Sequence, residues 1–197
     1  MKKIIFIITV LISISCSSQQ TISLSNYNGS NDLVNNNYIK DIDGILDKFV
    51  GTWEWNNGST TIFRIKFVKV LHNKTSNIET YFEDEILGGY QYILNGVEVV
   101  NTLNFTTNFT ETPTSYINFS PLLTSIDSPD FTNLHIIAND KIKNKSCGAK
   151  FTIQNATSNP LTAQWKLYNI EIYRPENLGV KPVGFSIPTN VVLTKLP

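Results

Sequence analysis

An alternation of hydrophobic and polar residues is the clearest pattern in this chain, and it predicts β-strands in the middle of the sequence. In residues 60–71 the hydrophobic set is Phe63, Ile65 and Phe67. In residues 78–87 hydrophobic and acidic side chains alternate, with Phe82 and Ile86 set against Glu79, Glu83 and Glu85. A period of two is typical of a strand that buries one face and exposes the other.

Turn signals place these and further strands in hairpins. A strand beginning at Gly51-Thr52-Trp53-Glu54-Trp55 precedes Asn57-Gly58, and strands at 90–94 and 97–105 flank Asn95-Gly96. Asn-Gly favours the tight turns of two-residue hairpins. Gly88-Gly89 permits a kink or bulge. Later strands are expected at residues 116–119, 133–138, 148–154, 162–173 and 191–196, with a long loop rich in Thr, Ser and Pro at 106–130.

A register between the first two alternating strands follows from their side chains. Folding residues 60–71 onto 78–87 about the polar segment 72–77 brings opposite charges together on one face. The predicted pairs are Lys66 with Glu83, Arg64 with Glu85, Phe67 with Phe82 and Phe63 with Ile86. The acidic residues are therefore interpreted as cross-strand ion pairs and not as a catalytic carboxylate pair.

Asp84 does not fit this arrangement, because the register places it on the hydrophobic face beside Ile65. A buried carboxylate without a partner is costly. Either a bulge redirects Asp84, or the side chain faces a polar interior site. Asp84 is therefore the candidate ligand-binding residue of the domain.

Helical spacing appears before the first of these strands. The hydrophobic residues of 38–50 recur at intervals of three and four, but Gly44 interrupts them, so we expect one short or broken helix. Asp41-Ile42-Asp43-Gly44 lacks the alternating oxygen ligands and the distal Glu of a calcium loop, so capping and solvated turns explain these carboxylates. Together the elements predict an all-β fold, an antiparallel meander closed into a lipocalin-like barrel, with a β-sandwich as the alternative.

The N-terminal residues predict export and lipid anchoring. Residues 1–15 combine a cationic start with an almost wholly aliphatic stretch, which is typical of a secretory signal peptide and too short to span a bilayer. Ser13-Ile14-Ser15-Cys16 resembles the bacterial lipobox, although Ser13 stands where Leu is usual. Cys16 is thus the expected lipidation site. Residues 16–38 are expected to form a flexible tether, and residues 39–197 a single β-rich domain.

Composition narrows the classes of partner and chemistry. The formal net charge is zero, which gives no electrostatic reason to expect nucleic acid as a partner. If Cys16 is acylated, Cys147 has no disulfide partner and is interpreted as a small buried strand residue. His72, expected in a hairpin loop, and His135 lie far apart without neighbouring Cys or His, so no metal and no other cofactor is predicted.

Enzyme motifs are also missing from the sequence. It contains no nucleophile elbow, zinc-binding helix, phosphate loop or dinucleotide glycine pattern, which favours a protein that is not an enzyme. A glycan-active hydrolase stays open, because two catalytic carboxylates need not be close in sequence. Trp53, Trp55 and Trp165 are interpreted as core residues, with sugar stacking or an apolar ligand cavity as the alternative.

Two resemblances add to this picture. Phe49-Val50-Gly51-Thr52-Trp53 resembles the start of a lipocalin or fatty-acid-binding barrel, which implies that Lys195 packs on the tryptophan. The segments from Gly89 to Glu98 and from Gly184 to Lys195 resemble an uncharacterised family of lipoproteins from Bacteroidetes-type bacteria. That resemblance implies family membership and an envelope location, and it supplies no catalytic or binding residue.

Three functional hypotheses follow. The leading one is a non-enzymatic, lipid-anchored binding module of the cell envelope, attached to the outer membrane, whose partner is a small apolar ligand or an envelope protein. The second is a structural or protein-interaction component of the envelope, using an exposed edge strand or the loop at 106–130. The third is the glycan-active hydrolase, with Asp84 as its unusually placed acid.

Overall fold

The computed structural model describes residues 19–76, 80–105, 122–126, 131–155, 157–168 and 183–197. The signal peptide at 1–15, the lipidation site Cys16 and the strand expected at 116–119 lie outside these residues. Within them the chain is nearly all β, and its strands form one mixed sheet. The strands are β1 Thr21–Ser23, β2 Tyr38–Lys40, β3 Gly51–Asn56, β4 Ile62–Ser76, β5 Thr80–Leu94, β6 Val97–Asn101, β7 Leu122–Ile126, β8 Asn133–Asp140, β9 Lys145–Asn155, β10 Thr162–Tyr168 and β11 Asn190–Lys195.

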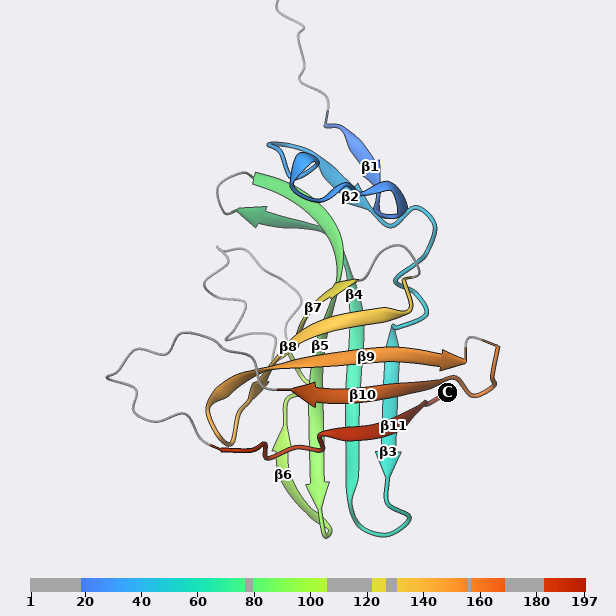
Figure 1. Cartoon of the computed structure of the whole chain (residues 1–197), viewed down its shortest axis with the longest axis vertical. Helices are drawn as coiled ribbons and strands as arrows, with labels where there is room; N and C mark the ends of the chain where they lie inside the picture. Colours follow the sequence, from blue (N-terminus) through green and yellow to red (C-terminus); the bar gives the residue numbers. More distant parts are fainter. Residues whose placement is uncertain (1–18, 77–79, 106–121, 127–130, 156, 169–182) are drawn as a thin grey trace, which may run out of the picture.

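The sheet is open in its strand order and strongly curled. Its order is β1-β2-β5-β4-β3-β11-β10-β9-β8-β7, with β6 added beside β5. Strands β3 to β6 run along the long axis of the molecule, and β8 to β11 cross in front of them (Figure 1). The parallel pairings of β1 with β2 and of β2 with β5 make the sheet mixed.

The closed antiparallel barrel expected from the sequence is therefore wrong. Strand β5 offers one edge to β4, and its other edge is divided among β2, β7 and β6. Strand β7 meets that edge through only two residue pairs, Leu87 with Leu123 and Gly88 with Leu122. The curl thus brings the two ends of the sheet together without a continuous ladder, because other strands occupy most of the β5 edge.

No helix forms where a short N-terminal helix was expected. Residues 41–50 form turns, in which Asp47 N–H donates to Gly44 at 3.2 Å and Phe49 N–H donates to Leu46 at 3.1 Å. Gly44 adopts a φ of +67°, which a right-handed helix does not allow. The hydrophobic spacing still serves burial, since Leu46 and Phe49 lie in the core.

The segment before these turns also contains regular structure. Residues 17–38 were expected to form only a tether, yet strand β1 lies here and pairs with β2. Two 3₁₀ turns follow β1, η1 at Leu24–Asn26 and η2 at Gly29–Asn31. We refer to residues 19–40 as the N-terminal cap, which lies at the upper end of the molecule in Figure 1.

The β4–β5 pairing keeps the predicted faces but has a different register. Phe63 lies opposite Tyr92 and not Ile86, a shift of six positions along β5. The reason is that β4 continues to Ser76, into the segment 72–77 that was expected to form the loop. An even shift leaves each side chain on its face. Phe63, Ile65 and Phe67 are fully buried, as predicted.

The other strand and hairpin predictions are confirmed in part. The loop expected at 106–130 contains strand β7, the strand expected at 97–105 ends at Asn101, and five residues, not two, connect β3 to β4. Asn95 and Gly96 have φ angles of 52° and 82°, as a type I′ turn requires, and they connect β5 to β6. Gly58, with φ of +76°, lies between β3 and β4. The expected later strands correspond to β8, β9, β10 and β11.

Gly88 and Gly89 lie inside β5 and do not end it. A Cβ atom at Gly88 would stand 2.7 Å from Cδ1 of Phe67, and one at Gly89 would overlap the carbonyl oxygen of Thr102. The two glycines are thus explained by close approach of neighbouring groups on both faces of the strand.

The core lies between the two crossing groups of strands and is filled by aromatic rings. Trp53 of β3 and Phe67 of β4 both meet Phe151 of β9 edge-on, with ring centroids 4.9 and 5.1 Å apart. Phe63 contacts Trp165 of β10 at 5.7 Å. All five side chains are fully buried. Such contacts across the layers hold the curled sheet together.

Candidate functional site

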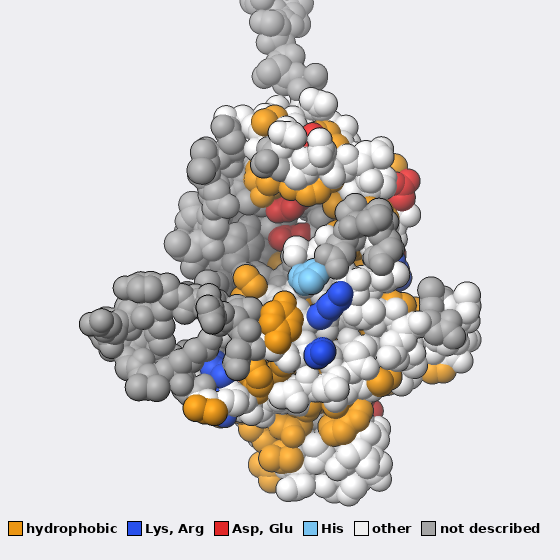
Figure 2. Space-filling model, viewed as in Figure 1, with side chains coloured by type: hydrophobic (Ala, Val, Ile, Leu, Met, Phe, Trp, Pro, Cys, Tyr) orange, Lys and Arg blue, Asp and Glu red, His pale blue; other side chains and the backbone are white. Residues whose placement is uncertain are grey.

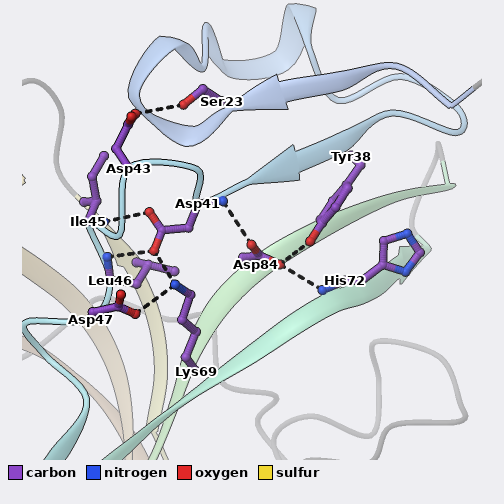
Figure 3. A network of polar contacts seen from close by, with 10 residues as sticks. All are labelled: Ser23, Tyr38, Asp41, Asp43, Ile45, Leu46, Asp47, Lys69, His72 and Asp84. Carbon is purple, nitrogen blue, oxygen red and sulfur yellow. Dashed lines mark hydrogen bonds and ion pairs between the residues drawn. The ribbon is translucent and has the colours of Figure 1, made fainter.

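Asp84, the candidate ligand-binding residue, is buried and accepts three hydrogen bonds from the protein. Its Oδ1 accepts from the hydroxyl of Tyr38 at 2.7 Å and from the backbone N–H of His72 at 2.9 Å. Its Oδ2 accepts from the backbone N–H of Asp41 at 3.0 Å. Figure 3 shows these donors converging on the carboxylate from β2, β4 and the segment after β2.

The structure thus combines the two alternatives drawn from the sequence for Asp84. The β4–β5 ladder shifts by one residue between Val70 and Asn73, so a bulge does lie opposite Asp84. The bulge turns the N–H of His72, whose φ is 51°, toward the carboxylate. Asp84 occupies a polar interior site, and the groups that fill it belong to this chain.

A second buried carboxylate, Asp41, adjoins the first. Its Oδ1 accepts from Ile45 N–H at 2.7 Å, and its Oδ2 accepts from Leu46 N–H at 3.0 Å. The ammonium group of Lys69 lies 2.6 Å from Asp41 Oδ2 and 2.9 Å from Asp47 Oδ1. The capping role expected for the carboxylates of this segment is confirmed for Asp41, whereas the ion pair with Lys69 was not predicted.

Electrostatic interactions in this cluster favour the charged form of Lys69. Burial acts to lower the pKa of Lys69, but its hydrogen bonds to Asp41 and Asp47 outweigh burial and raise the pKa above its ordinary value. Burial, followed by the hydrogen bond to Asp84, raises the pKa of the Tyr38 hydroxyl, which stays protonated as a donor. We call the set Tyr38, Asp41, Lys69 and Asp84 the cap joint.

The cap joint connects the N-terminal cap to the two long strands. Tyr38 belongs to β2, Lys69 to β4 and Asp84 to β5, and Asp41 follows β2 directly. Each described carboxylate oxygen in it already has a donor within 3.0 Å. The geometry suits a structural connection, because buried charges are stabilised by such pairing and hydrogen bonding.

Glu83 and Glu85 are on the other face of β5, and their predicted ion pairs with Lys66 and Arg64 are wrong. Glu85 lies opposite Val70 and accepts a hydrogen bond from the Asn73 side chain. Arg64 instead bonds Glu54 Oε2 at 2.6 Å. Burial, followed by the nearby charge of Glu83, raises the pKa of Glu85 to about 7.

The two histidines lie in different parts of the sheet. His72, expected in a loop, is in β4, where its ring stacks on Phe82 with centroids 4.2 Å apart. His135 is in β8, opposite Lys150 of β9. Among the residues that the structure describes, no three His, Cys, Asp or Glu side chains are grouped closely enough to hold a metal ion.

Cys147 is buried in β9, and its thiol donates to the carbonyl of Ala138 at 3.3 Å. The prediction of a small buried strand residue is therefore confirmed. Trp53 and Trp165 are core residues, also as predicted. The Nζ of Lys195 lies 5.5 Å from the Trp53 ring centroid, so the contact implied for these two residues is present.

Trp55 differs from the other tryptophans because it is only partly buried. Cross-strand pairing sets Trp55, Phe63, Tyr92 and Val100 in one row across β3, β4, β5 and β6. Trp55, Tyr92 and Val100 pack against the core and are only partly buried, whereas Phe63 is fully buried.

Beyond this row the hydrophobic surface continues to the end of the β5–β6 hairpin. Leu94 and Val97 pair across the strands and are 42% and 67% exposed. We call Trp55, Tyr92, Leu94, Val97 and Val100 the distal rim. Figure 2 shows hydrophobic side chains gathered at this end of the molecule, opposite the N-terminal cap.

Comparison with known proteins gives a family and no activity. A family of unknown function, DUF6705, matches residues 1–196, and the chain belongs to that family. No curated protein and no solved structure matches it. Within the part of the chain that the structure describes, no helix has the length and hydrophobicity needed to cross a membrane.

Proposed function

We propose that this protein is a lipid-anchored component of the bacterial cell envelope, and that its β-domain binds an apolar ligand or a protein partner without catalysing a reaction. The location draws on the signal-peptide pattern at 1–15, on Cys16 and on the resemblance to lipoproteins of Bacteroidetes-type bacteria. An outer-membrane attachment is part of this proposal.

The distal rim is the observation that carries the binding function. Trp55, Tyr92 and Val100 continue the row of the buried Phe63 to the surface. Leu94 and Val97 are exposed beyond them. Contiguous exposed hydrophobic side chains mark interaction sites more often than isolated ones do. Because the core itself is filled by aromatic rings, the rim is the better place for an apolar contact.

The position of the rim suits a protein held at its N-terminus. The N-terminal cap and the β5–β6 hairpin lie at opposite ends of the molecule (Figure 1). Acylation at Cys16 would place the cap toward the lipid and the rim away from it. The rim would then face components of the envelope beyond the headgroups.

The alternative of a structural or protein-interaction component shares this surface, since the rim fits a protein partner as well as a small molecule. The glycan-hydrolase alternative draws little support from Asp84, because its three hydrogen bonds come from Tyr38, Asp41 and His72 of the chain itself. A general acid needs access to the substrate oxygen.

The anchor is tested with the full chain in its own host. Intact mass measurement of the mature protein should give a chain that begins at Cys16 and carries acyl groups, and Cys16→Ala should release the protein from the membrane fraction. A mature chain without acyl groups would overturn the proposed location. Native mass spectrometry of the same material identifies any small apolar ligand that remains bound.

A further inference from the structure

The N-terminal cap is fixed to the sheet from its first described residues. The carbonyl of Gln20 accepts the N–H of Tyr38 at 2.8 Å, and β1 continues this pairing along β2. The side-chain oxygen of Gln19 lies 3.3 Å from Nε2 of His72 in β4. Contact with the sheet therefore begins at residue 19, and not at residue 39 as the sequence predicted.

Further contacts join the cap to the start of β5 and to the core. The N–H of Asn36 donates to the carbonyl of Thr80 at 2.7 Å. The N–H of Phe82 donates to the carbonyl of Asn37 at 2.8 Å. Leu24 packs against the hydrophobic core. The cap is thus an extension of the sheet, at the end of the molecule opposite the β5–β6 hairpin (Figure 1).

A short stretch of chain separates this fixed segment from the expected lipidation site. Ser17 and Ser18 stand between Cys16 and Gln19. Consecutive Cα atoms are about 3.8 Å apart, so the Cα atoms of Cys16 and Gln19 are at most about 11 Å from each other. A flexible segment as long as residues 17–38 would instead span about 25 Å. An acylated Cys16 would therefore hold the cap close to the lipid headgroups.

We propose that the N-terminal cap rests on the phospholipid headgroups of the leaflet that holds Cys16, with the long axis of the molecule directed away from the membrane. This inference rests on the proposed function, because it requires the acyl anchor. Residues 19–40 contain one acid and one base, Asp32 and Lys40, so the cap has no net charge that a charged membrane surface would attract or repel. Its exposed side chains are rich in amides, namely those of Asn26, Asn28, Asn31, Asn35 and Asn36. Amides donate hydrogen bonds to oxygen acceptors, which the phosphates and esters of a headgroup layer supply.

This arrangement narrows the partners open to the distal rim. Strand β5 runs from the cap to the hairpin of Leu94 and Val97, and its 15 residues span at most about 50 Å. With the cap on the headgroups, the rim stands at the far end of that strand. An apolar molecule dissolved in the same leaflet then lies out of its reach. The partner of the rim is therefore a molecule located outside that leaflet.

Fluorescence quenching at the headgroups tests the position of the cap. Full-length protein from its own host is checked for acyl groups by intact mass and reconstituted into phosphatidylcholine vesicles that contain a lipid with a nitroxide on its headgroup. In a Cys147→Ala background, a fluorophore is attached through Asn31→Cys in the cap or through Ser59→Cys. Both positions are exposed, and Ser59 is the matched control because its neighbour Thr60 bonds the β5–β6 turn. A further variant carries about 20 Gly and Ser residues inserted between Ser18 and Gln19, which lengthens the connection by about 25 Å. Far-ultraviolet circular dichroism establishes that each variant is folded.

The label at Asn31 should be quenched at least about twofold more than the label at Ser59, and the insertion should remove most of this difference. Equal quenching of the two labels in acylated protein would overturn the inference and leave the anchor intact. No quenching at Asn31 would leave the cap to an envelope protein and would also overturn it. Quenching that persists after the insertion would overturn the role of the short connection. Protein without acyl groups would instead overturn the proposed location.

Discussion

The carboxylate of Asp84 accepts the backbone N–H of Asp41 at 3.0 Å, and through this contact a strand of the main sheet holds the segment that leaves the N-terminal cap. The side chain of Asp41 in turn holds the turn at Ile45 and Leu46 and pairs with Lys69. Asp84 thus fixes the backbone of Asp41, and the side chain of Asp41 fixes the turn that follows it. The connection explains how the segment 17–37, which has few hydrophobic residues, keeps strand β1 and the two 3₁₀ turns against the sheet.

Replacing Asp84 should reduce stability. In Asp84→Asn the amide nitrogen cannot accept the N–H of Asp41, so one buried donor loses its partner. We expect a loss of about 2 kcal/mol in the free energy of unfolding, measured by urea titration. Asp43→Asn is the matched control, since Asp43 bonds only exposed serines among the described contacts. An equal effect of the two substitutions would contradict the structural role of Asp84.

Removing the ammonium group of Lys69 should leave the Asp41 carboxylate buried without its counter-ion. Lys69→Met keeps the length of the side chain, and we expect a loss of about 3 kcal/mol. Adding Asp41→Asn to Lys69→Met should cost less than the sum of the two single changes, because the pair acts together. Lys66→Met, on an exposed lysine of the same strand, should change stability little. Strict additivity in the double variant would argue against the ion pair.

Glu85 should make stability fall as the pH rises toward neutrality. Its pKa is raised from 4.5 in the unfolded chain to about 7 in the folded protein. The folded state therefore binds more protons between these values, and the free energy of unfolding falls over that interval. The full shift corresponds to about 3 kcal/mol, reduced where solvent reaches the carboxylate.

Urea titrations between pH 4 and 8 check this slope. Glu85→Gln mimics the protonated form, so it should flatten the slope and raise stability above pH 7. Glu98→Gln, on an exposed residue of β6, should leave the slope as it is. The same slope in Glu85→Gln and in the unmodified protein would assign it to other groups.

The glycine pair of β5 should tolerate no side chain. In Gly89→Ala the new methyl group would overlap the carbonyl of Thr102, so that backbone must move. We expect a loss of about 1–3 kcal/mol, seen as a lower thermal midpoint in circular dichroism. Gly96→Ala probes a position with open space but a positive φ, and it should cost about 1 kcal/mol. A neutral Gly89→Ala would contradict the close approach at Thr102.

The sequence predicted the strands and their faces well, because alternation depends on local spacing alone. Phe63, Ile65 and Phe67 are buried as expected. The register failed because the even shift of six residues preserves every face, so hydrophobic pattern alone could not distinguish the two pairings. The polar composition of residues 72–77 favours a turn, whereas β4 extends to Ser76, past the core.

The burial of Asp84 could be predicted, but its partners could not. Tyr38, Asp41 and His72 reach it from distant parts of the chain, and the parallel pairing of β2 with β5 brings the first two there. No local sequence pattern predicts a parallel pairing between the three-residue strand β2 and the long strand β5. The open sheet was missed for the same reason, since the expected meander assigned each strand only to its neighbours in sequence.

Site-specific photo-crosslinking in the native host tests the proposed binding function most directly. A photoreactive residue is placed at Val97 in the distal rim, or at Ile42, which is 59% exposed and follows the N-terminal cap. We predict that Val97 gives one recurrent adduct, with a protein or a small apolar molecule, which Leu94→Asp abolishes and which Ile42 does not give. The same adducts from both positions, or none from Val97, would contradict a binding surface at the rim.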